Sequence, residues 1–237
     1  MTTPLIIWGT AFIIYAIFWL WYVGFRKPLT KEEIDHYINK LQEFNNNSEA
    51  ELIGMRNFFE KDTGKSFVMV NSISLKKKPD LVEGVKEGDT SLKTLINYHK
   101  PFMKMMFKRG GIGIFQGRVA GNSVDVINIE NAEEWQISAI NRFRSRRDFA
   151  EILIHPLFHE KHELKFAALD KSIAYPVDPW FQLGGVPLTV GLVLALIAAI
   201  AHIFLVYSFL CCLGKILVKI LYSFCSISKR SVLLFFL

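Results

Sequence analysis

The sequence predicts an α+β domain that lies between two apolar helices, and three observations lead to this fold class. Residues 4–25 and 183–214 contain no charged residue, and a helix of about 20 apolar residues spans a hydrocarbon core. Between them, runs rich in β-branched and aromatic residues alternate with runs whose apolar residues recur at helical spacing. These middle residues suffice for one ordinary domain.

The first apolar stretch predicts a retained anchor helix over residues 1–27. It lacks the basic start of a cleaved signal peptide. It also carries Trp8, Trp19 and Trp21, bulky aromatic residues of the kind found at membrane interfaces.

Two capping boxes then predict two helices. Thr30 is followed three residues later by Glu33, and Ser48 is followed in the same way by Glu51. We assign these helices to a helical linker over residues 28–65.

The domain itself is expected over residues 66–180. After a strand pattern at 66–75, apolar residues recur at helical spacing from Leu92 to Met106. Pro101 should kink or break that helix. The remaining elements, in order, are strand patterns at 112–119, 124–129 and 135–143, a helix capped by Ser145, a second helical piece at 157–169, and a last strand at 172–177.

This order of elements is close to the split βαβ, ferredoxin-like arrangement. Such a sheet carries helices on one face only, and its other face must find cover, commonly the same face of a second copy. We therefore expect a homodimer that forms through the sheet face.

The second apolar stretch predicts a transmembrane helix over residues 181–214. Residues 215–237 are also apolar, but Lys219 and the pair Lys229-Arg230 interrupt them. We expect this tail to lie in the membrane interface or to pack against another membrane subunit.

The charges beside the two spans favour opposite orientations. Arg26 and Lys27 follow the first span and would keep the domain in the cytoplasm, whereas Lys215 and Lys219 follow the second span and argue for the other side. Because the first helix usually dominates, we expect a two-pass membrane protein with a cytoplasmic domain.

One stretch matches a known pattern. Trp135 opens a strand, the run Arg142-Phe143-Arg144-Ser145-Arg146-Arg147-Asp148-Phe149 turns into a helix, and Pro156-Leu157-Phe158 and His162 precede the last strand. This resembles the DUF1330-like proteins of the dimeric α+β barrel superfamily, in a membrane-anchored variety. The resemblance covers roughly residues 66–177 and implies the fold. It leaves the function open, because related barrel families include cofactor-free monooxygenases, isomerases and haem enzymes.

Arginines gather where the third strand turns into the next helix. Arg142, Arg144, Arg146 and Arg147 could bind an anion or a lipid headgroup. The alternative is that they pair with acidic neighbours and hold the turn together; those neighbours are Glu133, Glu134 and Asp148.

A pocket between sheet and helix is a possible catalytic site. His99, Trp135 and Asn141 could line it, and His99 could act as an acid or base near neutral pH. Because His99 lies on the apolar stripe of its helix, a core histidine is the alternative.

Four histidines are candidate metal or haem ligands. His155, His159 and His162 have helical spacing, which would suit a transition metal. Pro156 falls among them and argues for surface or capping roles instead. His202 lies alone in the second span, where it could bind a cofactor or form a hydrogen bond between helices. No metal and no cofactor is favoured.

Several function classes are excluded or disfavoured. The basic residues are scattered and no nucleic-acid motif accompanies the net charge of +6. The cysteines lie at positions 211, 212 and 225, so the domain has no disulfide framework and no thiolate nucleophile. The sequence contains no P-loop and no Ser-His-Asp signature.

We therefore expect a membrane-anchored accessory or scaffold subunit whose domain dimerises or docks within a larger membrane assembly. Its partners would be membrane lipid, other membrane-protein subunits and a second copy. The alternative is a membrane-tethered isomerase- or monooxygenase-like enzyme, or a haem- or metal-binding variant, that uses the barrel pocket.

Overall fold

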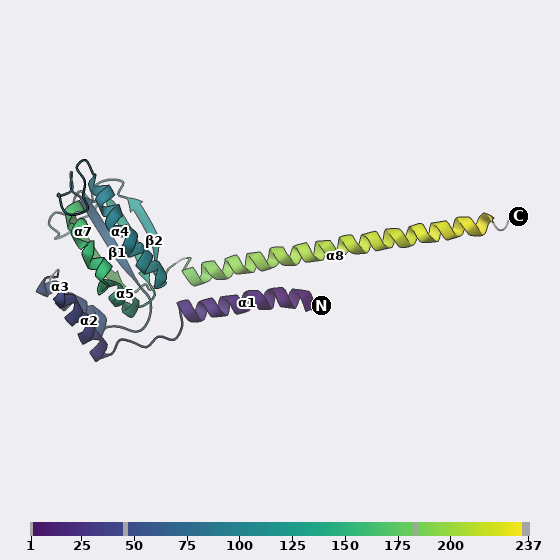
Figure 1. The fold of residues 1–237 in the computed structure, drawn as a ribbon, viewed down its shortest axis with the longest axis horizontal. Coiled ribbons are helices and arrows are strands. Elements are labelled where there is room, and N and C mark those ends of the chain that lie inside the picture. Colours follow the sequence, from purple (N-terminus) through teal and green to yellow (C-terminus); the bar gives the residue numbers. More distant parts are fainter. Residues whose placement is uncertain (1, 45–46, 183, 234–237) are drawn as a thin grey trace. The chain divides into compact units, whose positions relative to one another are not determined.

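The structure, a computed structural model, describes residues 2–44, 47–182 and 184–233 (Figure 1). The chain divides into two compact units. One is made of the two terminal segments, and the other is Tyr22–Gln182. The second unit contains the domain that the sequence predicts.

Two helices make up the terminal unit. They are α1 (Thr2–Tyr22) and α8 (Val186–Leu233). By length and composition, Pro4–Tyr22 and Val186–Ser208 could each cross a membrane. The expected tail does not form a separate element, because residues 215–233 continue α8. Residues 234–237 of that tail lie outside the described residues.

Both capping boxes are confirmed. Helices α2 (Lys31–Glu43) and α3 (Glu49–Glu60) begin after Thr30 and Ser48, whose side chains accept hydrogen bonds from the backbone of Glu33 and Glu51. The two helices do not form a linker to the domain, because their apolar faces are part of its core. Ile34, Ile38 and Phe59 are buried in the same cluster as the sheet residues.

The domain is α+β, as predicted, with a four-stranded antiparallel sheet in the order β2-β3-β1-β4. Its strands are β1 (Phe67–Leu75), β2 (Ile112–Arg118), β3 (Ile137–Phe143) and β4 (Leu169–Val177). Helix α4 (Ser91–Lys108) joins β1 to β2. The connection from β3 to β4 consists of α5 (Arg146–Leu153), α6 (Pro156–Glu160) and α7 (His162–Ala168). Each helical connection joins two parallel strands that flank a third, which is the split βαβ arrangement.

The core lies between the sheet and its helices, and aromatic rings fill its centre. The rings of Phe67 and Phe143, on neighbouring strands, stack with centroids 5.2 Å apart, and Phe149 from α5 meets Phe143 edge-on at 4.8 Å. All three residues are buried. In Figure 1 the helices α4, α5 and α7 lie in front of the strands, so they cover one face of the sheet.

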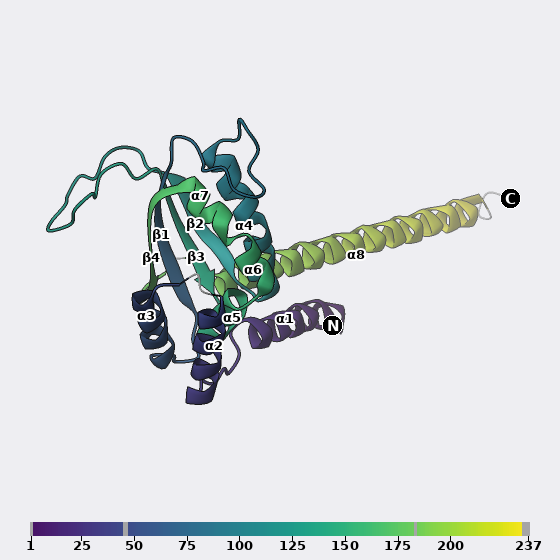
Figure 2. The ribbon, with the colours of Figure 1, turned by 60° about the vertical axis from the view of Figure 1, so that its left-hand side comes forward.

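Two predictions about single elements need correction. Of the kink or break predicted at Pro101, the break is wrong, because helix α4 runs from Ser91 to Lys108. Packing of its buried face outweighs the lost hydrogen bond, and that face includes Leu95, Tyr98 and Met105. Residues 124–129 are not a strand. They belong to a loop that projects from the sheet between β2 and β3 (Figure 2).

A third prediction, the helical segment at 157–169, is right about the helical structure but not about its continuity. The helical piece expected at 157–169 is two short helices, α6 and α7, since Lys161 ends the first one. The capping of α5 by Ser145 is confirmed, because its side chain accepts a hydrogen bond from the backbone of Asp148.

Candidate functional site

The helix-free face of the sheet carries a continuous apolar row. The strand register puts Phe115 opposite Ile140, Ile140 opposite Val70, and Val70 opposite Tyr175. Residues directly opposite each other in a ladder point to the same face, and these alternate with residues that pack against the helices, such as Phe143. Phe115 is 53% exposed and Tyr175 is 47% exposed. We call this set the apolar row.

An irregularity in β2 gives Phe115 its position. The register between β2 and β3 shifts between Gly113 and Phe115, so Ile114 is an extra residue of the kind that forms a β-bulge. If Gly113, Ile114 and Phe115 alternated regularly, Phe115 would lie on the same face as Gly113, toward the helices. The bulge therefore adds an aromatic ring to the apolar row.

The next row of the same face consists of three small residues and, at its β4 end, Ile173. Gly117 pairs with Ser138, Ser138 with Ser72, and Ser72 with Ile173. We call this set the small row. A methyl group on Gly117 would lie 3.1 Å from the ring of Phe115, so a larger residue there would require the ring to move by a few tenths of an ångström. The face thus combines a row of large side chains with a shallower row beside it.

The two cations on this face have partners within the chain. Arg142 donates to the hydroxyl of Ser66 at 2.9 Å and lies 5.3 Å from the ring centroid of Tyr22. Lys171 donates to the carbonyl oxygens of Asn131 and Glu133, and lies over the ring of Trp135. Both side chains are therefore held by uncharged groups of the same chain, although Nε of Arg142 is buried without a hydrogen-bond partner among the described residues.

The other arginines of the predicted cluster also have partners inside the domain. Arg144 makes a two-pronged pair with Asp148, at 2.9 and 2.7 Å. Arg147 pairs with Glu33 of α2 at 2.6 Å. Of the three acidic partners that the sequence suggested, Asp148 is used in this way.

Arg146 is the most deeply buried of the four. Its side chain is 4% exposed and donates to the carbonyl oxygen of Phe58 and to both carboxylate oxygens of Asp178, at 3.3 and 3.0 Å. The buried carboxylate of Asp62 lies 3.8 Å away. Arg146 thus ties together α3, the start of α5 and the end of β4.

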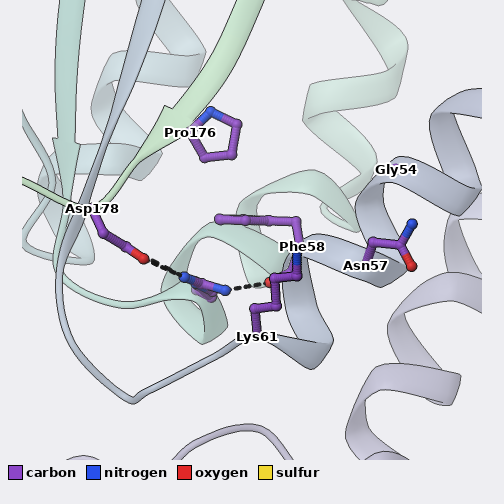
Figure 3. Close-up of a pocket in the computed structure, with 7 residues that line it drawn as sticks. Gly54, Asn57, Phe58, Lys61, Pro176 and Asp178 are labelled. Atoms are coloured by element: carbon purple, nitrogen blue, oxygen red, sulfur yellow. Dashed lines mark hydrogen bonds and ion pairs between the residues drawn. The ribbon is translucent and has the colours of Figure 1, made fainter.

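A pocket of about 330 Å³ opens above this guanidinium. Figure 3 shows Asn57 on α3 and Lys61 directly after it, across from Pro176 in β4 and Asp178 directly after that strand. The volume suits a small ligand. An anion would have to displace Asp178 from Arg146, because two carboxylates and a carbonyl oxygen already surround the guanidinium.

The structure does not bring the proposed catalytic trio together. His99 lies on α4, where its ring meets Phe102 edge-on at 6.0 Å. Trp135 packs under Lys171 on the helix-free side of the sheet, whereas Asn141 shares the covered face with Phe143. Burial lowers the pKa of His99, so that ring is neutral near pH 7, as expected of a core histidine.

The three neighbouring histidines have different partners. His155 caps α6 by accepting a hydrogen bond from the backbone of Leu157, and His159 contacts the carbonyl oxygen of Leu153 at 2.6 Å. His162 is buried, and burial lowers its pKa to about 4. Within the described residues no group of three or more His, Cys, Asp or Glu could hold a metal ion.

His202 has a partner on the other apolar helix. The indole nitrogen of Trp8 on α1 donates to Nδ1 of His202 on α8 at 3.3 Å. This is the hydrogen bond between helices that the sequence allowed as one of two roles.

Sequence reasoning missed the apolar row as a set of residues. The two-residue spacing of Val70 and Ser72, and of Tyr175 and Ile173, places each pair on one face and carries part of the signal. The face on which Phe115 lies depends on the bulge, and no pattern in the sequence predicts that bulge.

No protein-family model and no curated protein matches this chain. Solved structures with a similar fold include a protein of unknown function from Rhodopseudomonas palustris, at 18% identity over 58% of this chain and 97% of that chain, with a TM-score of 0.47. SnoaB, a cofactor-independent oxygenase from Streptomyces nogalater, is 10% identical over 51% of this chain and 98% of its own, with a TM-score of 0.32.

A third solved structure is a dimeric protein of unknown function with a ferredoxin-like fold from Bacteroides fragilis. It is 11% identical over 50% of this chain and 99% of its own, with a TM-score of 0.30. At such identities these likenesses concern the fold alone, so the function has to be argued from the surfaces of the domain.

Proposed function

We propose that this protein is a membrane-anchored scaffold subunit whose α+β domain pairs with a second copy through the helix-free face of the sheet. The observation that carries the proposal is the apolar row beside the small row. Exposed aromatic and aliphatic side chains that form one continuous patch mark an interaction surface.

The chemistry of the face favours a second copy as the occupant. A twofold axis brings the same patch of both copies together, so the large side chains of one copy can lie over the small row of the other. Arg142 and Lys171 are held by hydrogen bonds to neutral groups within the chain, so two copies can pair through the apolar row and the small row without using these cations. An identical face provides both rows.

Two membrane spans support the scaffold role by restricting the domain to a surface. Pro4–Tyr22 and Val186–Ser208 are the spans in this proposal, and Arg26 and Lys27 favour a cytoplasmic domain. Confinement to a bilayer raises the effective concentration of copies. The resemblance to membrane-anchored DUF1330-like proteins is part of the proposal, and the apolar C-terminal segment is a contact for other membrane subunits.

The test is the mass of the full-length protein in mild detergent, measured by mass photometry. Ile173→Asp puts a charge on the sheet face and is expected to convert a dimer to a monomer. Leu157→Asp is the matched control, because Leu157 is 46% exposed on the helix side of the domain, and it should leave the dimer intact.

Two results would contradict the proposal. One is a wild-type protein that stays monomeric at every concentration at which it is soluble. The other is a dimer that survives Ile173→Asp, which would assign pairing to another surface. Circular dichroism of both variants establishes that the domain is folded.

A further inference from the structure

The exposed side of α4 carries a single ridge of residues at four-residue spacing. Leu92 and Ile96 occupy its first half, and Lys100, Lys104 and Lys108 occupy its second half. Residues four apart on a helix are neighbours on its surface. All five side chains are exposed, since the opposite side of α4 packs into the core.

The three lysines of this ridge differ from Arg144, Arg146 and Arg147, which form ion pairs at the β3–α5 turn. Helix α4 contains no Asp or Glu, and in the described part of the chain no ion pair involves Lys100, Lys104 or Lys108. Lys93, by contrast, pairs with Asp89 at 2.7 Å. The ridge therefore presents uncompensated positive charge.

Large apolar side chains accompany this charge. Leu92 is 47% exposed, Ile96 is 45% exposed, and Phe107, three residues after Lys104, is 54% exposed. A helix that exposes apolar residues beside lysines combines the two attractions that hold a helix against an anionic bilayer, namely apolar burial and charge.

We propose that the α4 ridge binds the anionic lipid headgroups of the membrane in which this protein is anchored. This rests on the proposed membrane anchoring, because two spans keep the ridge within reach of lipid in every copy. An acidic protein would match the charge as well, but the two spans tether the domain to lipid and not to such a protein. Since α4 covers the opposite face of the sheet from the apolar row, lipid binding and pairing use different surfaces.

The lipid contact proposed here lies on the lysines of α4 and not on the arginines that the sequence suggested. Arg142, Arg144, Arg146 and Arg147 were the candidates, but each has partners within the chain. The lysines of α4 do not form a cluster in the sequence, because they are spread over nine residues, from position 100 to position 108. They share one side of the molecule because these residues form a helix.

The experiment uses the full-length protein in nanodiscs of phosphatidylcholine, with and without phosphatidylserine. A photoreactive benzophenone amino acid replaces Ile96, and mass spectrometry identifies what it captures after illumination. Phosphatidylserine adducts are expected to be at least fivefold more abundant than at a control position, Leu157, and to decline at high salt.

Variants test the role of the lysines. The triple variant Lys100→Glu, Lys104→Glu, Lys108→Glu should reduce the phosphatidylserine adduct severalfold, because the charge reverses. The control Lys61→Glu, Lys161→Glu changes exposed lysines elsewhere on the domain and should leave the adduct unchanged.

Three outcomes would overturn the inference. They are adducts no more abundant than at Leu157, an adduct that the triple variant retains, and capture of a protein instead of lipid. Failure of the membrane anchoring itself is distinguishable, since a chain without spans would be extracted from membranes at alkaline pH. A chain that resists extraction but yields no adduct refutes the lipid contact alone.

Discussion

The two faces of the sheet are built from the same four strands but differ in whether one chain completes them. On the covered face, Phe67 and Phe143 are buried under helices, and Arg146 nearby finds its partners within the domain. On the helix-free face, Phe115 and Tyr175 are about half exposed. The covered face therefore contributes most of the stability of the domain, while the helix-free face is available for association.

The sharpest test of this difference is the same substitution on each face. Phe143→Ala should lower the free energy of unfolding by about 3–5 kcal/mol, because it leaves a cavity in the core. Phe115→Ala should cost less than about 1 kcal/mol in the monomer. Thermal unfolding in detergent, at a dilution that prevents pairing, measures both; equal losses would mean that the faces do not differ as described.

The second test concerns the charges that the covered side encloses. Arg146→Ala should destabilise the domain by about 3 kcal/mol or more, because it leaves the buried carboxylate of Asp62 uncompensated. The control is Arg56→Ala, whose pair with Asp35 is largely exposed and should contribute below about 1 kcal/mol. Denaturant unfolding compares the two variants. Equal losses would show that burial of Arg146 does not matter.

The smallest expected effect is a loss of domain stability at acid pH. Burial, together with the positive charges of Lys165 and His159, lowers the pKa of His162 to about 4. The folded domain therefore disfavours the protonated ring, and stability that is present above the usual pKa of about 6.5 is lost as the pH falls toward 4.

His162→Phe should remove part of this acid sensitivity, on the order of 1 kcal/mol between pH 7 and pH 5. His36→Phe is the control, because His36 is exposed. Melting temperatures of both variants over this pH range provide the measurement. An unchanged acid sensitivity in the His162 variant would contradict the assignment.

The sequence was informative where the cause is local. Thr30 and Ser48 begin helices because their side chains and the glutamates three residues on satisfy backbone groups within one turn. The strand pattern at 66–75 was likewise recognised from its own residues, which are rich in Phe, Val, Met and Ile.

The partners of the arginines could not be predicted in the same way. Arg146 meets the carbonyl oxygen of Phe58, 88 residues earlier in the chain, and Arg147 meets Glu33, 114 residues earlier. Such pairs depend on how α2 and α3 pack against α5. A reading that takes α2 and α3 as a linker cannot find them.

The bulge at Ile114 also has a genetic consequence. Loss of the codon for Ile114 would remove the unpaired residue, and Phe115 would still lie opposite Ile140 and Gly117 opposite Ser138. The helix-free face would keep its residues and lose only the local twist that a bulge adds to a strand. A one-codon deletion at this position is therefore compatible with the same assembly, whereas a one-codon deletion in a regular part of a strand moves every following side chain to the other face.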